Sequence, residues 1–118
     1  IGNLATVVKA QVTFSHAERG YAETWNALRD DPLAKGQPAY LDIDFNNSVV
    51  SGYEYSIGPA GNPVVSNSGV ATNEDFHAWA DPTNPGGFGS GIYHYFVDAS
   101  GVLRYNAGGP ADETSEVL

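Results

Sequence analysis

Three histidines, His16, His77 and His94, are the side chains of this 118-residue chain that could most readily bind a metal or transfer a proton. His77 and His94 lie in two segments that we predict to be neighbouring strands. A zinc site there would need a third ligand, for which Asp75 and Asp81 are the nearby carboxylates. Half-exposed positions on a strand are the simpler interpretation of both histidines, so no metal site is predicted.

A serine–histidine–aspartate triad can be assembled on paper from Ser90, His94 and Asp98. Ser90 lacks the Gly-x-Ser-x-Gly elbow that exposes a nucleophilic serine. The three residues also lie along a single predicted strand, where neighbours on one face are about 6–7 Å apart. That separation is too long for direct hydrogen bonds between the three groups. No catalytic residue is therefore predicted, and the chain is not expected to be an enzyme.

Two further patterns resemble nucleotide-binding sites but lack the surroundings that such sites need. Asp42 and Asp44 match the metal-binding Asp-x-Asp pair of glycosyltransferases, whose nucleotide-binding domain is much larger than this chain. The glycine-rich run 86–91 has neither the lysine nor the following helix of a phosphate-binding loop. We interpret the first pattern as a solvated strand or loop and the second as a flexible turn.

Charge and composition restrict the class of protein. The 14 acidic and 5 basic residues give a formal net charge of −9. This balance disfavours nucleic acids and anionic membrane surfaces, because both bind through clustered Lys and Arg. The absence of cysteine excludes disulfides and thiolate chemistry. Methionine is absent too, so we expect that a segment before Ile1 has been removed. No run approaches the roughly 20 apolar residues that span a bilayer.

Residues 1–19 are predicted to form a helix, because no proline interrupts them and Gly20 follows as a C-terminal cap. At about 100° per residue the apolar side chains fall on two nearly opposite stripes. The first stripe contains Ile1, Leu4, Ala5, Val8 and Val12. The second stripe contains Val7, Ala10, Phe14 and Ala17.

A surface helix normally has one apolar face, so two stripes indicate two packing partners. We assign Ile1, Leu4, Val8 and Val12 to the core between the helix and its own sheet. We assign Val7, Ala10, Phe14 and Ala17 to an interface with another subunit, although the two roles could be exchanged. The alternative is a helix held between two layers of one domain, but a domain this small has few elements for a second layer.

The whole chain, 1–118, is predicted to be one domain with an α+β fold. After the helix come a connecting region (20–50), a sheet region (51–106) and a tail (107–118) that we expect to be solvated or loosely attached. Period-two alternation and turn residues predict four strands, at 53–57, 76–80, 92–97 and 102–105. The helix should cover one face of this antiparallel meander.

The strongest local signal is the hairpin turn between the last two predicted strands. Asp98 is suited to begin a type I turn, and Gly101 is suited to the left-handed position that follows. Together they predict a short hairpin loop with a bulge.

Several strings of residues resemble type IV pilins and the related pseudopilins of type II secretion. Residues 4–14 (LATVVKAQVTF), continuing to Gly20 and Tyr21, are similar to the helix exit of pilin-like proteins. Residues 76–82 (FHAWADP) are similar to their second strand, and residues 95–105 (YFVDASGVLRY) to their terminal hairpin. The resemblance covers most of the chain and is weakest over residues 30–50.

The resemblance implies the globular head of a structural subunit in an extracellular, cell-surface filament, or of a secretion pseudopilin. Such a subunit assembles through its N-terminal helix with other copies of itself or with a pilin-like helical partner chain. It contacts the membrane only through an upstream helix that this sequence lacks. The basic leader, and the phenylalanine-initiated apolar helix with glutamate at its fifth position, are absent here, as is the cysteine pair of disulfide-bounded pilins.

Calcium is the one cofactor that the resemblance brings into consideration, because some pseudopilins bind it near their C-terminal strands. Asp81, Asp98 and Asp112 are the candidate ligands, although they lack EF-hand spacing.

Two other functions stay open. One is an extracellular module that binds carbohydrate or protein through tyrosines sharing a strand face, namely Tyr53 with Tyr55 and Tyr93 with Tyr95. The other is a small hydrolase, against which the poor surroundings of the histidines and Ser90 argue.

Overall fold

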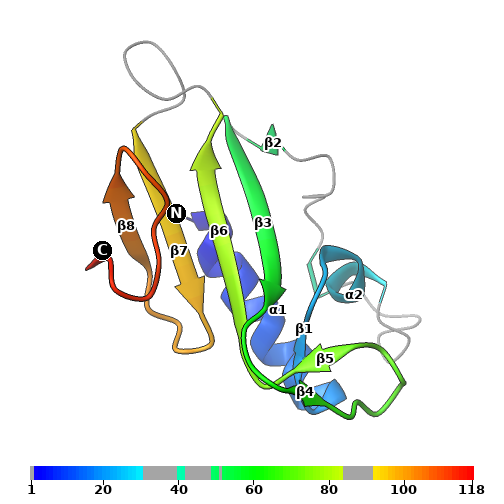
Figure 1. Cartoon of the computed structure of the whole chain (residues 1–118). Helices are drawn as coiled ribbons and strands as arrows, with labels where there is room; N and C mark the ends of the chain where they lie inside the picture. Colours follow the sequence, from blue (N-terminus) through cyan, green and yellow to red (C-terminus); the bar gives the residue numbers. More distant parts are fainter. Residues whose placement is uncertain (1, 31–39, 42–48, 51, 84–91) are drawn as a thin grey trace.

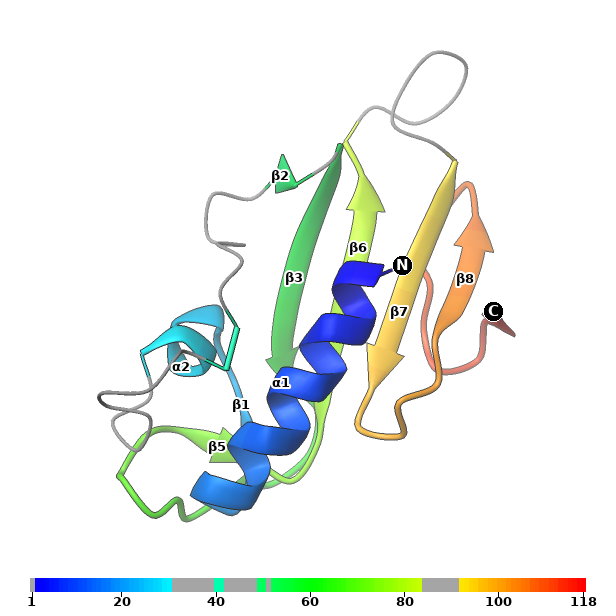
Figure 2. The same cartoon turned by 180° about the vertical axis from the view of Figure 1, so that it is seen from behind.

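A long helix lies across one face of an antiparallel sheet, and a smaller sheet packs at one end (Figures 1 and 2). The computed structural model describes residues 2–30, 40–41, 49–50, 52–83 and 92–118. Ile1, the Asp42 and Asp44 pair and the run 86–91, which includes Ser90, lie outside the described residues. The predicted mixture of an N-terminal helix and antiparallel strands is confirmed.

The described elements follow one another along the chain as two helices and nine strands. They are α1 (Gly2–Glu18), β1 (Tyr21–Ala22), α2 (Trp25–Arg29), β2 (Val49–Val50), β3 (Tyr53–Pro59), β4 (Pro63–Val64), β5 (Thr72–Asn73), β6 (Phe76–Pro82), β7 (Tyr93–Asp98), β8 (Arg104–Ala107) and β9 (Glu116–Val117). The larger sheet has the order β2-β3-β6-β7-β8-β9, and the smaller one has the order β1-β5-β4. All four predicted strands are present, as β3, β6, β7 and β8.

Strand β6 shows how the sheet presents one face to α1. Phe76, Ala78 and Ala80 are buried in the cluster that contains the helix side chains. The residues between them are only partly buried, as expected when successive side chains point to opposite faces. Because Ala78 and Ala80 are small, the helix can approach the sheet closely.

The core face of α1 differs from the predicted one. Val7, Ala10 and Phe14 are buried in the chain's own core, so the expectation that they face another subunit is wrong. Val8 is partly buried and packs against the core, whereas Val12 is 43% exposed, so the assignment of Val12 to the helix–sheet core is wrong as well.

The structure confirms the burial of one further stripe member and not the assignment of another. Leu4 is fully buried, as expected. Ala17, which was assigned to the subunit interface, is partly exposed near the end of α1. The core stripe follows the spacing i, i+3, i+7, i+10, i+14 through Leu4, Val7, Gln11, Phe14 and Glu18, and the buried Ala10 lies beside it.

The helix end also differs from the prediction. Arg19, rather than Gly20, has the positive φ of a left-handed residue, at 77°. Gly20 is needed for close packing, because a Cβ there would lie 3.0 Å from the Thr72 Cβ and 3.1 Å from the Asn73 carbonyl oxygen. A glycine at this position therefore lets β5 approach the chain as it leaves α1.

The turn at the start of the β7–β8 connection has the predicted hydrogen bond and left-handed glycine, although the pairing of the two strands begins only at Phe96 and Arg104. The Gly101 amide donates to the Asp98 carbonyl oxygen at 3.0 Å, and Gly101 has a φ of 77°. The Asp98 Oδ1 atom accepts hydrogen bonds from the Ser100 amide at 3.0 Å and the Ser100 hydroxyl at 2.5 Å. These contacts hold the turn in place.

The tail is not loosely attached, which corrects the prediction for residues 107–118. β9 extends the sheet by pairing with β8, and the Leu118 amide donates to the Leu103 carbonyl oxygen at 2.9 Å. The Arg104 guanidinium donates to the Ser115 carbonyl oxygen at 2.9 Å, and Ala111 is buried. These contacts were not predicted from the sequence, because the tail is rich in polar residues.

The segment 64–73, which lies outside the four predicted strands, contributes to the smaller sheet. β4 and β1 both pair with β5, on opposite sides. Strands this short are set by their surroundings rather than by a sequence pattern, so the alternation on which the prediction relied cannot detect them.

Candidate functional site

A polar pair on the face of the sheet opposite α1 is the first candidate for chemistry. His94 Nδ1 on β7 lies 2.6 Å from Asp81 Oδ1 on β6. The histidine side chain is 15% exposed and the aspartate side chain is 37% exposed. His94 is therefore held by Asp81, whereas Asp98 bonds within its own turn. Of the triad considered from the sequence, His94 and Asp98 therefore have other partners, and Ser90 lies outside the described residues.

The other two histidines serve different environments. The His77 ring packs edge-on against Phe96 and Trp79, with ring centroids 4.9 Å and 5.7 Å away. These three rings form a cluster on the outer face of the sheet, which explains the half-burial of His77. His16 is exposed in the last turn of α1.

The three calcium candidates are not brought together. Within the described ranges there is no group of three His, Cys, Asp or Glu side chains that could hold a metal ion. Asp81 is paired with His94, and Asp98 accepts from Ser100. Asp81 thus bonds across to the neighbouring strand, and Asp98 bonds within its own turn.

Asp112 also bonds close to its own position in the chain. Its carboxylate accepts from the Thr114 hydroxyl at 2.6 Å and the Thr114 amide at 2.9 Å. These bonds favour the charged form and hold the pKa of Asp112 below its usual range. Asp112 therefore orders the turn before β9.

Two buried polar side chains on α1 position the helix, and sequence reasoning missed both. The Gln11 side-chain amide donates to the Ala22 carbonyl oxygen at 2.9 Å, and its oxygen accepts from the Ala22 amide at 2.7 Å. Gln11 thus continues the smaller sheet beyond β1 in the way that a backbone would. The Gln11 side chain is fully buried, and it pairs with both the amide and the carbonyl oxygen of Ala22.

Glu18 makes the second polar anchor at the end of α1. Its buried carboxylate accepts from the Ser68 amide at 2.9 Å and from the Ser68 hydroxyl. The neighbouring Asn67 side chain donates to the Ala17 carbonyl oxygen at 2.7 Å, which satisfies one of the last helix carbonyls. The loop after β4 is in this way fastened to the helix.

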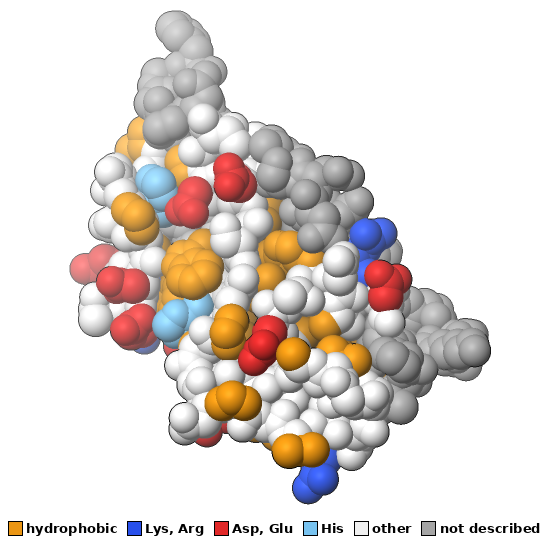
Figure 3. Space-filling model, turned by 45° about the vertical axis from the view of Figure 1, so that its right-hand side comes forward, with side chains coloured by type: hydrophobic (Ala, Val, Ile, Leu, Met, Phe, Trp, Pro, Cys, Tyr) orange, Lys and Arg blue, Asp and Glu red, His pale blue; other side chains and the backbone are white. Residues whose placement is uncertain are grey.

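The face of the molecule shown in Figure 3 carries scattered acidic side chains, histidine side chains and few basic ones. This distribution agrees with the net charge of −9 and provides no cluster of Lys and Arg on the face shown. Of the helices in the described part of the chain, none is long and apolar enough to cross a membrane.

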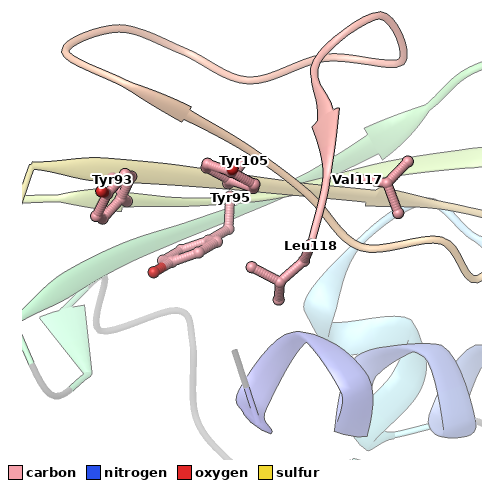
Figure 4. Close-up of a pocket in the computed structure, with 5 residues that line it drawn as sticks. All are labelled: Tyr93, Tyr95, Tyr105, Val117 and Leu118. Atoms are coloured by element: carbon pink, nitrogen blue, oxygen red, sulfur yellow. The ribbon is translucent and has the colours of Figure 1, made fainter.

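A pocket at the β7–β9 end of the sheet is a further candidate site. We call it the tyrosine pocket; its volume is about 330 Å³, and it is lined by Tyr93, Tyr95, Tyr105, Val117 and Leu118. The Tyr93 and Tyr105 rings pack edge to face, with centroids 5.6 Å apart. Tyr95 and Leu118 point to the side of the sheet on which α1 lies (Figure 4).

The sequence pointed to only part of this pocket. Tyr93 and Tyr95 were recognised as tyrosines sharing a strand face. Tyr105, Val117 and Leu118 were missed, because the tail was expected to be loose. The apolar pair Val117 and Leu118 at the end of a polar tail is the signal that could have indicated the attachment of β9.

The tyrosines next to the pocket predict a response to alkaline pH. Burial raises the pKa of the Tyr53 phenol, and the neighbouring Tyr95 and Tyr55 phenols raise it further. A raised folded-state pKa contributes stability that is complete below the unfolded pKa, about 10, and is lost as the pH rises through the folded value. We expect the free energy of unfolding to fall more steeply above about pH 10 in the wild type than in Tyr53→Phe, as measured by urea denaturation. Equal slopes would contradict the assignment.

Comparison with known proteins gives no relative for this chain. No protein-family model, no curated protein and no solved structure matches it.

Proposed function

We propose that this chain is a non-catalytic structural subunit of an extracellular pilin-like filament and that it assembles through α1. The observation that supports the proposal is the position of α1, which lies along the sheet with one stripe sealed in the core and the opposite side free. The sequence resemblance to pilin heads is the reason for proposing a filament rather than another kind of assembly. Its partners are other copies of the chain or a pilin-like helical partner chain.

The proposed interface is now the exposed side of α1, because the stripe with Val7, Ala10 and Phe14 is buried in the core. Val12 is 43% exposed there, next to the exposed residues Lys9, Thr13 and His16. The partly buried Val8 lies one turn earlier, and its Cγ1 atom lies 3.8 Å from the position that a Cβ on Gly101 would occupy. Because Val12 is exposed, it adds little to the stability of the monomer and is accessible to another chain.

Substitution of Val12 tests the proposal. We expect Val12→Asp to prevent filament assembly while lowering the free energy of unfolding by less than about 1 kcal/mol, because the side chain is exposed in the monomer. Assembly is measured as the amount of filament sheared from cells that produce the native polypeptide, and stability is measured by urea denaturation of the purified chain.

Val65→Asp is the matched control, because Val65 is 83% exposed in the loop between β4 and β5. It introduces the same charge away from α1 and should leave assembly intact. Normal filaments from Val12→Asp would refute assembly through this side of the helix. Equal loss of filaments in both variants would show an effect of added charge rather than of the helix surface.

A further inference from the structure

An aromatic surface lies on the face of the sheet opposite α1. On β6, Ala78 and Ala80 are buried toward the helix, so Trp79 between them points to the other side. Trp79 pairs across the sheet with Phe96 on β7, and the two ring centroids are 6.0 Å apart. Phe96 is buried, whereas Trp79 and its neighbour His77 are only partly buried. Among the described residues, no helix covers β6 and β7 on this side (Figure 1), so part of the Trp79 ring remains accessible.

Polar groups with spare hydrogen-bonding capacity border this aromatic surface. Asp81, two residues after Trp79 on the same strand and face, is held through its Oδ1 atom by Nδ1 of His94. Among the described residues, no hydrogen bond reaches Asp81 Oδ2, His94 Nε2 or the Trp79 indole N–H. The indole N–H can only donate a hydrogen bond, and a carboxylate oxygen can only accept one. A ligand that uses both must therefore present donors and acceptors side by side.

The neighbouring strand β3 leaves room beside Trp79. Its small residues Ser56 and Gly58 pair with Trp79 and His77. A Cβ placed on Gly58 would meet no heavy atom within 4 Å outside its neighbours in the chain, so the space there is open. Residues on one face of a strand are about 6–7 Å apart, so His77 and Asp81 flank Trp79 at about that distance on its two sides. A ring-sized ligand over Trp79 could reach these flanking groups with hydrogen bonds of ordinary length.

We propose that this surface, centred on Trp79, binds a neutral glycan through one pyranose ring. The apolar face of a pyranose can stack on an aromatic ring, and each of its hydroxyl groups both donates and accepts hydrogen bonds. An ammonium ion could only donate, so it would leave the indole N–H without a partner. The Asp81 carboxylate and the net charge of −9 disfavour an anionic glycan.

A protein partner fits this surface less well. The aromatic strip is bounded along β6 by the polar side chains of His77 and Asp81, whereas a stable protein interface buries about 800 Å² on each partner. One sugar ring needs no more than the Trp79 ring and its polar border. The inference goes beyond the proposed filament function and does not depend on it.

Titration of the purified chain with oligosaccharides tests the proposal. The neutral probes are cellotriose, maltotriose, mannotriose, triacetylchitotriose and lactose, and sialyllactose is the anionic counterpart of lactose. Binding is followed by NMR, in which the indole N–H signal of Trp79 reports directly on the site. We expect at least one neutral probe to bind saturably and to shift this signal, and sialyllactose to bind no better than lactose. Trp79→Ala should weaken binding roughly tenfold or more, as is typical when a central tryptophan is truncated.

A second variant decides the matter if Trp79→Ala does not fold. Gly58→Ile keeps Trp79 and places a strand-favouring side chain in the open space beside it, so it should fold and also weaken binding. Tyr93→Ala is the control, because it removes an exposed tyrosine at the tyrosine pocket and should leave binding unchanged.

Three results would overturn the proposal. They are no binding of any neutral probe at about 10 mM, well above a millimolar Kd; unchanged binding in Gly58→Ile and in folded Trp79→Ala; and loss of binding in Tyr93→Ala, which would place the glycan at the tyrosine pocket. Tighter binding of sialyllactose than of lactose would also contradict the choice of a neutral glycan. Filament assembly is measured separately, so none of these results decides the proposed function.

Discussion

Replacing Phe14 by alanine is expected to lower the free energy of unfolding by about 3–5 kcal/mol, the cost of removing a large aromatic side chain from a packed core. Phe14 is fully buried, and its ring packs edge-on against Tyr40 with centroids 5.9 Å apart. It also belongs to the cluster that joins α1 to the sheet through Phe76 and Ala78. Urea denaturation followed by circular dichroism measures the change.

The matched control is Val12→Ala, which also shortens an apolar side chain on α1. Because Val12 is 43% exposed, the expected change is within about 0.5 kcal/mol. Phe14→Leu keeps most of the core volume and should cost less than about 1.5 kcal/mol, so it remains measurable if the alanine variant does not fold. Similar stability of Phe14→Ala and Val12→Ala would restore the idea that Phe14 faces another subunit.

Replacing Gln11 by leucine is expected to lower the free energy of unfolding by about 2–4 kcal/mol, because the Ala22 amide and carbonyl would lose their partners inside the protein. Leucine has a similar size, so the loss is one of hydrogen bonds rather than of volume. Both groups of Ala22 now bond to Gln11 at 2.7 and 2.9 Å, and both residues are fully buried.

Hydrogen exchange separates this cause from a general loss of packing. The Ala22 amide should exchange faster in Gln11→Leu relative to amides of β6, because its acceptor is removed. Lys9→Leu is the control, since it makes the same kind of change at an exposed position of α1 and should leave both stability and exchange at Ala22 unchanged. Unaltered protection of Ala22 in Gln11→Leu would show that the Gln11 contact does not hold β1 to the helix.

Gln11 and Glu18 explain why the faces of α1 were assigned wrongly from the sequence. Leu4, Val7 and Phe14 belong to one stripe with Gln11 and Glu18, and the two polar members lie along its centre. When only apolar residues are counted, this stripe is divided into two. Leu4 is then assigned to the helix–sheet core, and Val7 and Phe14 are assigned to a subunit interface. Glutamine and glutamate are seldom fully buried, so without their partners they indicate a solvated seam.

The same reasoning applies to the tail and the pocket. Asp98 and Gly101 were predicted correctly, because the dihedral angles of a tight turn depend on residues next to one another in the sequence. Val117 lines the pocket only because β9 pairs with β8, and that pairing depends on Arg104 and Leu103, more than ten residues earlier. From composition alone, the tail was therefore predicted to be solvated.

The sequence by itself determined the N-terminal helix, the four central strands, the hairpin turn and the absence of cysteine chemistry. Each of these follows from local periodicity, turn residues or composition. Only the tertiary structure decided which side of α1 is buried, that Gln11 and Glu18 belong to the core, and that the tyrosine pocket exists. A buried polar group is stable only where a distant partner satisfies it. The sequence shows the polar group itself, whereas the partner, such as Ala22 or Ser68, is supplied by the fold.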